Sequence, residues 1–189
     1  MLKNLAIFIS LCLLNACSFN EDAGVVYHDS FDFSAVQSYS LYDRNSAFSE
    51  SQSLLDSRRN AIEIAIERMM AKKHFSYIEP EQADVIVTYY VMNGKRSDYS
   101  SYNEMVHFCQ HCLRATAWKT DNRYASATHG SLILDLVDPK KQRSVWRSVY
   151  PLDIKVKDNS AKRNEKIQQA VASMLAQYPK VSMTSRAAH

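Results

Sequence analysis

The chain has 189 residues, of which 46% are hydrophobic and 23% are charged, with 23 basic residues against 20 acidic ones and a net charge of +3 at pH 7. This near balance provides no dense basic face of the kind that nucleic acid or an anionic membrane surface requires. With only three glycines and no long biased run, the composition is that of a folded globular domain.

Residues 1–16 have the organisation of a signal peptide. One cation, Lys3, precedes an apolar run from Leu5 to Leu14 that only Ser10 interrupts. About ten apolar residues are half of what a membrane-spanning helix needs, and they match the central region of a secretory leader. We therefore expect this segment to be removed and to form no part of the fold.

The end of this leader resembles the lipobox of bacterial lipoproteins. Leu14, Ala16 and Cys17 stand at the expected places, whereas Asn15 departs from the small or branched residue usual there. The resemblance implies that Cys17 takes a diacylglycerol and further acyl chains such as palmitate, and that Ser18 directs export to the outer membrane. Several acyl chains, at about 0.8 kcal/mol per buried methylene, give a nearly permanent anchor on the periplasmic face. The alternative is an ordinary secretory leader with a chance cysteine.

Cleavage would leave residues 17–189, and the loss of Lys3 would lower the 23 basic residues to 22 against 20 acidic. Residues 17–24 are polar and are predicted to form a tether that reaches at most about 25 Å. A single domain is expected over 25–178, with an excursion at 95–129, and the patternless residues 179–189 are expected to form a mobile tail.

The first half of the domain predicts strands around one helix. Aromatic and β-branched residues favour extended pieces over 25–28, 38–42 and 75–78, and residues 83–92 give the strongest strand signal, expected at the centre of a sheet. A helix that starts at Ser51 or Ser53 and runs to about Lys73 carries an apolar stripe at spacings of three and four, expected to pack in the core: Leu55, Ile62, Ala65, Ile66, Met69 and Met70.

The second half predicts a hairpin and a helix. Residues 131–138 and 144–150 read as two strands joined by a turn at 139–142, and residues 161–177 as an amphipathic helix that Pro179 stops. Strict alternation assigns Leu132, Leu134 and Leu136 to one face, and separates Val145, Arg147 and Val149 from Trp146 and Ser148. The whole order predicts an α+β fold, a two-layer sandwich with two amphipathic helices on one face of a small antiparallel or mixed sheet of about four strands.

The excursion at 95–129 lacks clear periodicity and is rich in Ser, Tyr, Asn and His. A connection of this length inside a compact domain is usually functional or partly disordered, and we expect irregular strands near 105–108 and 113–119. Its tyrosines either supply contact area for a partner or pack within the loop: Tyr99, Tyr102 and Tyr124.

Several of these pieces, in this order, resemble the bacterial lipoproteins of domain-of-unknown-function family 4136 (DUF4136). They are residues 27–33 leading to 39–42, the Ala83-Asp84-Val85 start of the central strand, residues 130–138 and residues 145–147. The resemblance implies an envelope lipoprotein with a small α/β domain, and it supplies no activity and no catalytic residues. Gly130 and Trp146 are expected to serve a backbone bend and core packing.

Two cysteines remain once Cys12 leaves with the leader and Cys17 is acylated. Cys109 and Cys112 favour a local disulfide in an oxidising compartment, worth about 2 kcal/mol for so short a loop. A zinc or copper site with His107 or His129 is the main alternative, although four ligands would be needed. A thioredoxin-like redox pair and two unpaired thiols also remain open.

Signals for catalysis are absent from the sequence. There is no Gly-x-Ser-x-Gly motif, glycine is too rare for a phosphate-binding loop, and Asp84, Asp135 and Asp138 are expected at strand ends or turns in solvated or capping roles. We therefore expect a noncatalytic lipoprotein without a cofactor that binds or supports another envelope component, a protein or peptidoglycan, and not nucleic acid. The alternative is a periplasmic metal-binding protein that uses Cys109, Cys112 and a histidine.

Overall fold

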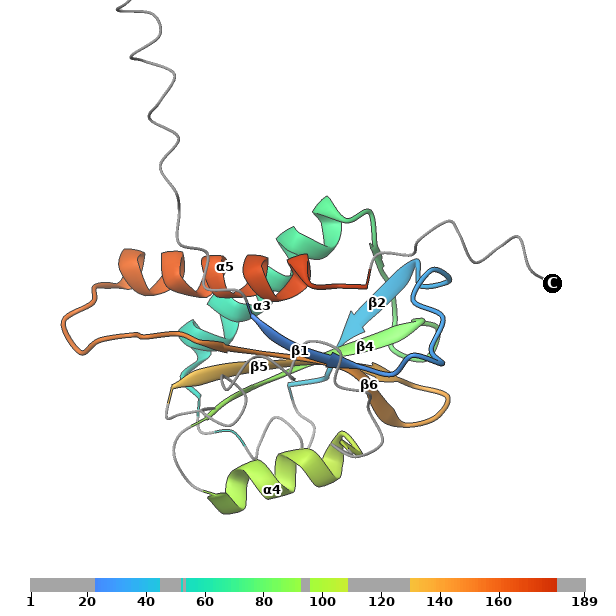
Figure 1. The fold of residues 1–189 in the computed structure, drawn as a ribbon. Coiled ribbons are helices and arrows are strands. Elements are labelled where there is room, and N and C mark those ends of the chain that lie inside the picture. Colours follow the sequence, from blue (N-terminus) through green and yellow to red (C-terminus); the bar gives the residue numbers. More distant parts are fainter. Residues whose placement is uncertain (1–22, 45–51, 53, 93–95, 109–129, 180–189) are drawn as a thin grey trace, which may run out of the picture.

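The computed structural model describes residues 23–44, 52, 54–92, 96–108 and 130–179. Its centre is a six-stranded sheet of order β1-β6-β5-β4-β2-β3, with α3 and α5 on one face and α4 on the other (Figure 1). The elements are β1 (Gly24–Tyr27), β2 (Ser38–Leu41), α3 (Asp56–Lys72), β3 (Ser76–Tyr77), β4 (Val85–Val91), α4 (Arg96–Met105), β5 (Ser131–Asp138), β6 (Arg143–Pro151) and α5 (Ser160–Ala176).

The predicted α+β class is confirmed, and so is the packing of two helices on one face of a mixed sheet. The sheet has six strands rather than about four, because both weak extended pieces join it: β1 pairs antiparallel with β6, and β3 pairs parallel with β2. The antiparallel β4–β5–β6 meander forms the middle of the sheet. The addition of α4 on the second face makes a third layer over part of the sheet (Figure 1).

The main core lies between the sheet and the helix pair α3 and α5. Leu132, Leu134 and Leu136 contribute to it from one face of β5, as alternation predicts, and Trp146 is fully buried there. The predicted stripe of the first helix is correct except at its start. Leu55 is 74% exposed because α3 begins only at Asp56 and Leu55 is its N-cap residue.

A bulge in β6 corrects the predicted faces of this strand. Leu136 pairs with Trp146 while Val137 pairs with Ser144, so that Val145 has no direct partner in the ladder. Val145 therefore joins Trp146 in the main core, whereas the prediction placed it with Arg147 and Val149. An extra residue in one strand reverses the alternation beyond it, which strict period-two reasoning cannot anticipate.

The end of α3 adopts the Schellman pattern with a histidine where glycine is usual. His74 has a φ of 64°, its N–H donates to the Ala71 carbonyl at 3.0 Å, and the Phe75 N–H donates to the Met70 carbonyl at 3.0 Å. This turn leads directly into β3. None of the helices among the described residues combines the length and the apolar character that a bilayer crossing requires.

Replacing His74 by glycine should stabilise the protein. The exposed side chain is held in the left-handed region, where an L-residue is strained, so His74→Gly should raise the free energy of unfolding by roughly 0.5–1 kcal/mol. Urea denaturation measures this change. Lys72→Gly, at the last helical residue of α3, is the matched control and should lower stability by up to about 1 kcal/mol; an equal loss in both variants would contradict the assignment.

Candidate functional site

The most distinctive chemical feature of the fold is an ion pair buried between the sheet and α4. Asp135 and Arg147 are direct cross-strand partners on β5 and β6, and both side chains are completely shielded from solvent. Arg147 Nε donates to Asp135 Oδ1 at 2.8 Å and to Oδ2 at 3.0 Å. A buried pair of this kind is stable only when the remaining donors and acceptors are also satisfied.

Hydroxyl groups complete the environment of the carboxylate. Ser144 Oγ donates to Asp135 Oδ1 at 2.5 Å, and Tyr102 Oη of α4 donates to Oδ2 at 2.5 Å. Tyr102 Oη also lies 3.1 Å from Thr88 Oγ1. Burial, followed by the nearby Asp135 charge, raises the pKa of Tyr102 well above its usual value, so that its hydroxyl stays a hydrogen-bond donor.

Apart from its two bonds to Asp135, the guanidinium group of Arg147 is held by residues of α4 and its C-terminal turn. Its Nη1 donates to Asn103 Oδ1 at 2.7 Å and reaches the Tyr99 hydroxyl at 3.4 Å. Its Cζ lies 3.5 Å from the centre of the Phe108 ring and 5.3 Å from that of Tyr102. Nη2 makes no hydrogen bond, and aromatic faces stand beside the cation in place of a further acceptor.

The C-terminal turn of α4 places Phe108 on this cation. His107 has a φ of 47°, and the Phe108 N–H donates to the Asn103 carbonyl at 2.9 Å in a second Schellman pattern. The Ser144 N–H donates to the Val106 carbonyl at 2.7 Å, which fastens the same turn to the start of β6. The network therefore couples four elements: β4 through Thr88, β5, β6 and α4.

The expectation of an irregular strand near 105–108 is wrong, since residues 96–105 are helical and 106–108 form the helix end. One signal was present in the sequence: Tyr99, Tyr102 and Val106 recur at spacings of three and four. Tyr102 is fully buried and stacks on Tyr90 with 4.8 Å between ring centroids, so it packs within the domain rather than offering a surface.

The three aspartates have different roles. Asp84 accepts hydrogen bonds from the Gln37 and Ser38 N–H groups, which lower its pKa, and Asp138 accepts from backbone N–H groups in the β5–β6 turn. Both are the expected structural roles. The expectation is wrong for Asp135, which lies in the middle of β5 and is buried, because its partner Arg147 stands directly across the hairpin.

The other predicted site residues are not brought together among the described residues. His107 is exposed at the end of α4, one residue away from Phe108, whereas Cys17, Cys109, Cys112, Tyr124 and His129 lie outside the described residues. Within the described ranges, no group of three or more His, Cys, Asp or Glu side chains is arranged to hold a metal ion.

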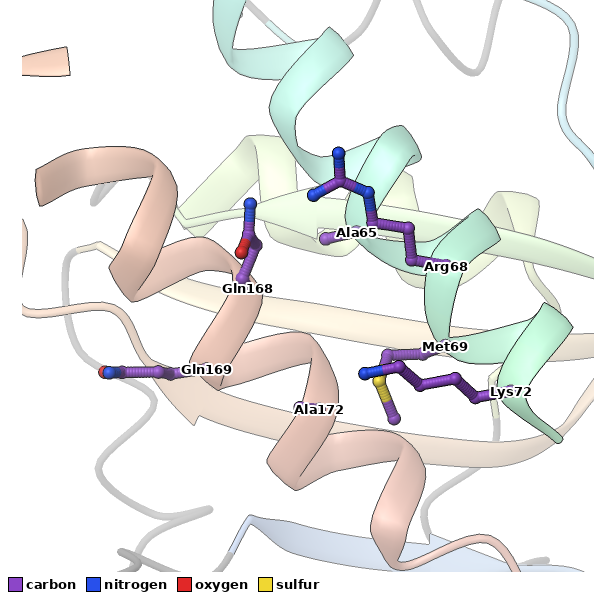
Figure 2. Close-up of a pocket in the computed structure, with 7 residues that line it drawn as sticks. All are labelled: Ala65, Arg68, Met69, Lys72, Gln168, Gln169 and Ala172. Atoms are coloured by element: carbon purple, nitrogen blue, oxygen red, sulfur yellow. The ribbon is translucent and has the colours of Figure 1, made fainter. Parts of the chain in front are cut away.

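Two shallow grooves follow the outer surface between α3 and α5. The first, of about 230 Å³, is drawn in Figure 2 and is lined by Ala65, Arg68, Met69, Lys72, Gln168, Gln169 and Ala172. The second, of about 140 Å³, lies near the start of both helices and is lined by Leu55, Ser57, Arg58, Ser160, Arg163, Asn164 and Ile167. The smaller groove is lined by the first turns of both helices and the larger one by later turns of both, so the two helices run in the same direction. Both are smaller than a typical small-molecule site.

Breaking the buried pair should lower the free energy of unfolding far more than breaking a surface pair. Arg147→Met leaves the Asp135 carboxylate buried without its counterion, with an expected loss of about 3–5 kcal/mol in the free energy of unfolding. Urea denaturation of Arg147→Met, Asp135→Leu and the double variant should show a loss in the double variant well below the sum of the single losses. Additive losses would contradict the pairing. The exposed pair Lys162–Glu165 is the control, and Lys162→Met should change stability little.

Comparison with known proteins gives a family and a fold. The DUF4136 profile, described as a domain of unknown function, matches residues 24–180. A crystal structure of a DUF4136 family protein (BT2437) from Bacteroides thetaiotaomicron VPI-5482 is 16% identical, with a TM-score of 0.54, over 82% of this chain and 94% of that chain. A PDZ domain protein from Parabacteroides distasonis ATCC 8503 is 14% identical, with a TM-score of 0.50, over 95% of this chain and 41% of that chain.

Comparison with curated protein sequences finds no significant match. At these identities the solved structures support the fold alone, and the family description assigns no function. The profile, in contrast, covers the domain from the first strand to the end of the last helix, in agreement with the resemblance noted in the sequence. The chain therefore belongs to the DUF4136 family.

Proposed function

We propose that the protein is a noncatalytic lipoprotein, anchored to the outer membrane through Cys17, whose domain binds or supports another component of the periplasmic envelope. The observation that carries the noncatalytic part is the burial of the Asp135–Arg147 pair. A charged pair beside a tyrosine hydroxyl would be the best candidate for chemistry, yet both charged groups have no exposed surface and Tyr102 covers them. These residues serve to hold α4 on the sheet.

The anchoring part is supported by the sequence before β1. The lipobox-like ending at Cys17 is followed by a tether of about seven residues before the strand that begins at Gly24, which keeps the domain within about 25 Å of the membrane surface. A protein or peptidoglycan that lies close to the membrane is within reach of such a domain. The outer surface of α3 and α5, with Arg68, Lys72 and Gln168 along its groove, offers polar and basic contacts to such a component.

Replacing Cys17 by serine should release the protein from the membrane. In cells fed a clickable palmitate analogue, the wild-type chain should carry the label and fractionate with the outer membrane, while Cys17→Ser should lose both properties. Crosslinking in cells should capture one specific envelope component with the wild-type chain and much less with Cys17→Ser. Labelling of both variants would refute the anchor, and repeated failure to capture any component would refute the binding role.

A metal-binding function centred on Cys109 and Cys112 is the second candidate. It is favoured by His107, whose exposed imidazole, a common metal ligand, lies two residues before Cys109 at the end of α4. The first reading of the two cysteines remains a local disulfide, which would leave no thiol to bind metal.

Thiol counting on the native mature protein separates the two readings. We expect no free thiol before reduction, as a disulfide between Cys109 and Cys112 requires. After reduction, native mass spectrometry with zinc or Cu(I) should show no bound metal at micromolar concentrations. Two thiols that react only after a chelator is added, with one metal ion retained by the wild-type chain and lost in His107→Ala, would instead establish the metal site.

A further inference from the structure

A short turn at one end of the molecule projects a fully exposed apolar side chain. Between β6 and α5, the Asp158 N–H donates to the Lys155 carbonyl at 3.0 Å and closes a four-residue turn. Val156 and Lys157 occupy its two central positions. The Val156 side chain is 100% exposed, the highest value among the exposed large hydrophobic residues described.

The turn that exposes Val156 is held in place by side-chain hydrogen bonds. Asp158 Oδ2 accepts from the Lys155 N–H at 2.9 Å and from Lys166 Nζ at 2.7 Å, and Arg163 Nη2 approaches the Val156 carbonyl at 3.4 Å. These bonds fix the turn to the first part of α5. A valine held permanently in water is unfavourable, and an apolar partner would recover that free energy.

A second exposed apolar residue, Leu55, lies at the same end of the molecule. It is 74% exposed and occupies the N-cap position of α3, where Ser, Thr, Asp or Asn would stabilise the helix and where it makes no side-chain cap. Leu55 lines the smaller groove together with Arg163, the residue that also contacts the Val156 turn. Helix stability therefore does not explain a leucine at this position.

Basic residues outnumber acidic ones on the segments that carry these two apolar side chains. Seven basic residues lie on the segment 153–158 and on the first turns of α3 and α5, against four acidic ones, and one of the seven, Arg59, is buried: Arg58, Arg59, Lys155, Lys157, Lys162, Arg163 and Lys166, with Asp56, Asp153, Asp158 and Glu165. Three of the acids are paired within the group, Asp158 with Lys166, Glu165 with Lys162 and Asp153 with Lys155. Exposed apolar residues beside an excess of lysine and arginine match the boundary between acyl chains and anionic headgroups.

The start of β1 lies at the end of the sheet from which β6 leads toward this turn. In the antiparallel pair of β1 and β6, Gly24 stands opposite Val149, two residues before β6 ends and leads into the turn (Figure 1). The tether that precedes Gly24 therefore enters the domain on the side toward the Val156 turn. Because the tether reaches at most about 25 Å, this end of the domain is kept near whatever surface holds Cys17.

We propose that Val156 and Leu55, with the surrounding basic residues, form a membrane contact that rests on the anionic phospholipid surface in which the lipid on Cys17 is inserted. This inference rests on the proposed lipid anchor. The anchor supplies a high local concentration of membrane. A small contact surface is therefore enough to hold the domain against the bilayer, and the protein does not need a strongly basic net charge to bind there. The contact would fix the orientation of the domain, with Val156 and Leu55 toward the lipid and the sheet extending away from it.

Fluorescence quenching by brominated lipids tests the contact. The mature full-length protein is reconstituted in vesicles of phosphatidylethanolamine and phosphatidylglycerol, with and without bromine on the acyl chains, as the wild type and as Val156→Trp. The wild type supplies the background from Trp118 and Trp146. We expect brominated lipid to remove emission from the added indole in Val156→Trp. The matched control, Tyr77→Trp, alters a 56% exposed aromatic residue beyond the other end of α3 and should be unaffected.

Further arms separate the possible causes. Combining Lys155→Glu and Lys157→Glu with Val156→Trp should abolish the quenching, as should vesicles of phosphatidylcholine alone, because both remove the electrostatic attraction. Equal quenching in Val156→Trp and Tyr77→Trp, or none in either, would overturn the proposal. A change in the emission of the indole at position 156 that only a copurifying protein produces, and lipid does not, would also overturn it in favour of a protein interface. Mass spectrometry of the N-terminal peptide reports the lipid on Cys17 separately. If that lipid is absent, the anchor is refuted; if it is present and the indole at position 156 is not quenched, the membrane contact alone is refuted.

Discussion

The Asp135–Arg147 pair is the constraint on which the arrangement of the second face of the sheet depends. Two charges removed from water cost several kcal/mol each, and the cost is offset only when the geometry is close and the remaining polar atoms are bonded. Here β5 and β6 supply the two charges and Ser144, while α4 supplies Tyr102 and Asn103. Displacing α4 would leave buried acceptors and donors unpaired, so the network specifies where the helix docks.

The two faces of the sheet are thus stabilised by different means. Against α3 and α5 the contact is mostly apolar, with Trp146 and the three leucines of β5 in the main core, and Tyr89 of β4 donates there to the buried Glu63 of α3. Against α4 a smaller apolar cluster surrounds the charged network, and Phe108 lies over the Arg147 cation. The bulge at Val145 makes this division possible, because it adds one residue to the large core while Arg147 keeps its place opposite Asp135.

This division has consequences for function. The buried charged network holds α4 on the sheet. The surface features that are open to another molecule lie elsewhere among the described residues: the grooves between α3 and α5, and the turn that carries Val156. Near the C-terminal end of α4, the Schellman turn leaves His107 exposed immediately before the segment that carries Cys109 and Cys112. Family membership and fold are compatible with a binding or supporting role and specify no partner.

The sequence by itself determined the α+β class, the central strand, the hairpin, two helices within a few residues and the core face of β5, because period and turn residues are local signals. It also supplied the family resemblance. Only the tertiary structure decided the role of Asp135, since its partner stands twelve residues away and becomes adjacent only through the hairpin register. The same holds for the bulge that moves Val145, for the docking of α4 by long-range polar contacts, and for the basic residues that meet around Val156 in a chain of nearly balanced charge. Each of these depends on which segments pair in space, and no local period encodes that choice.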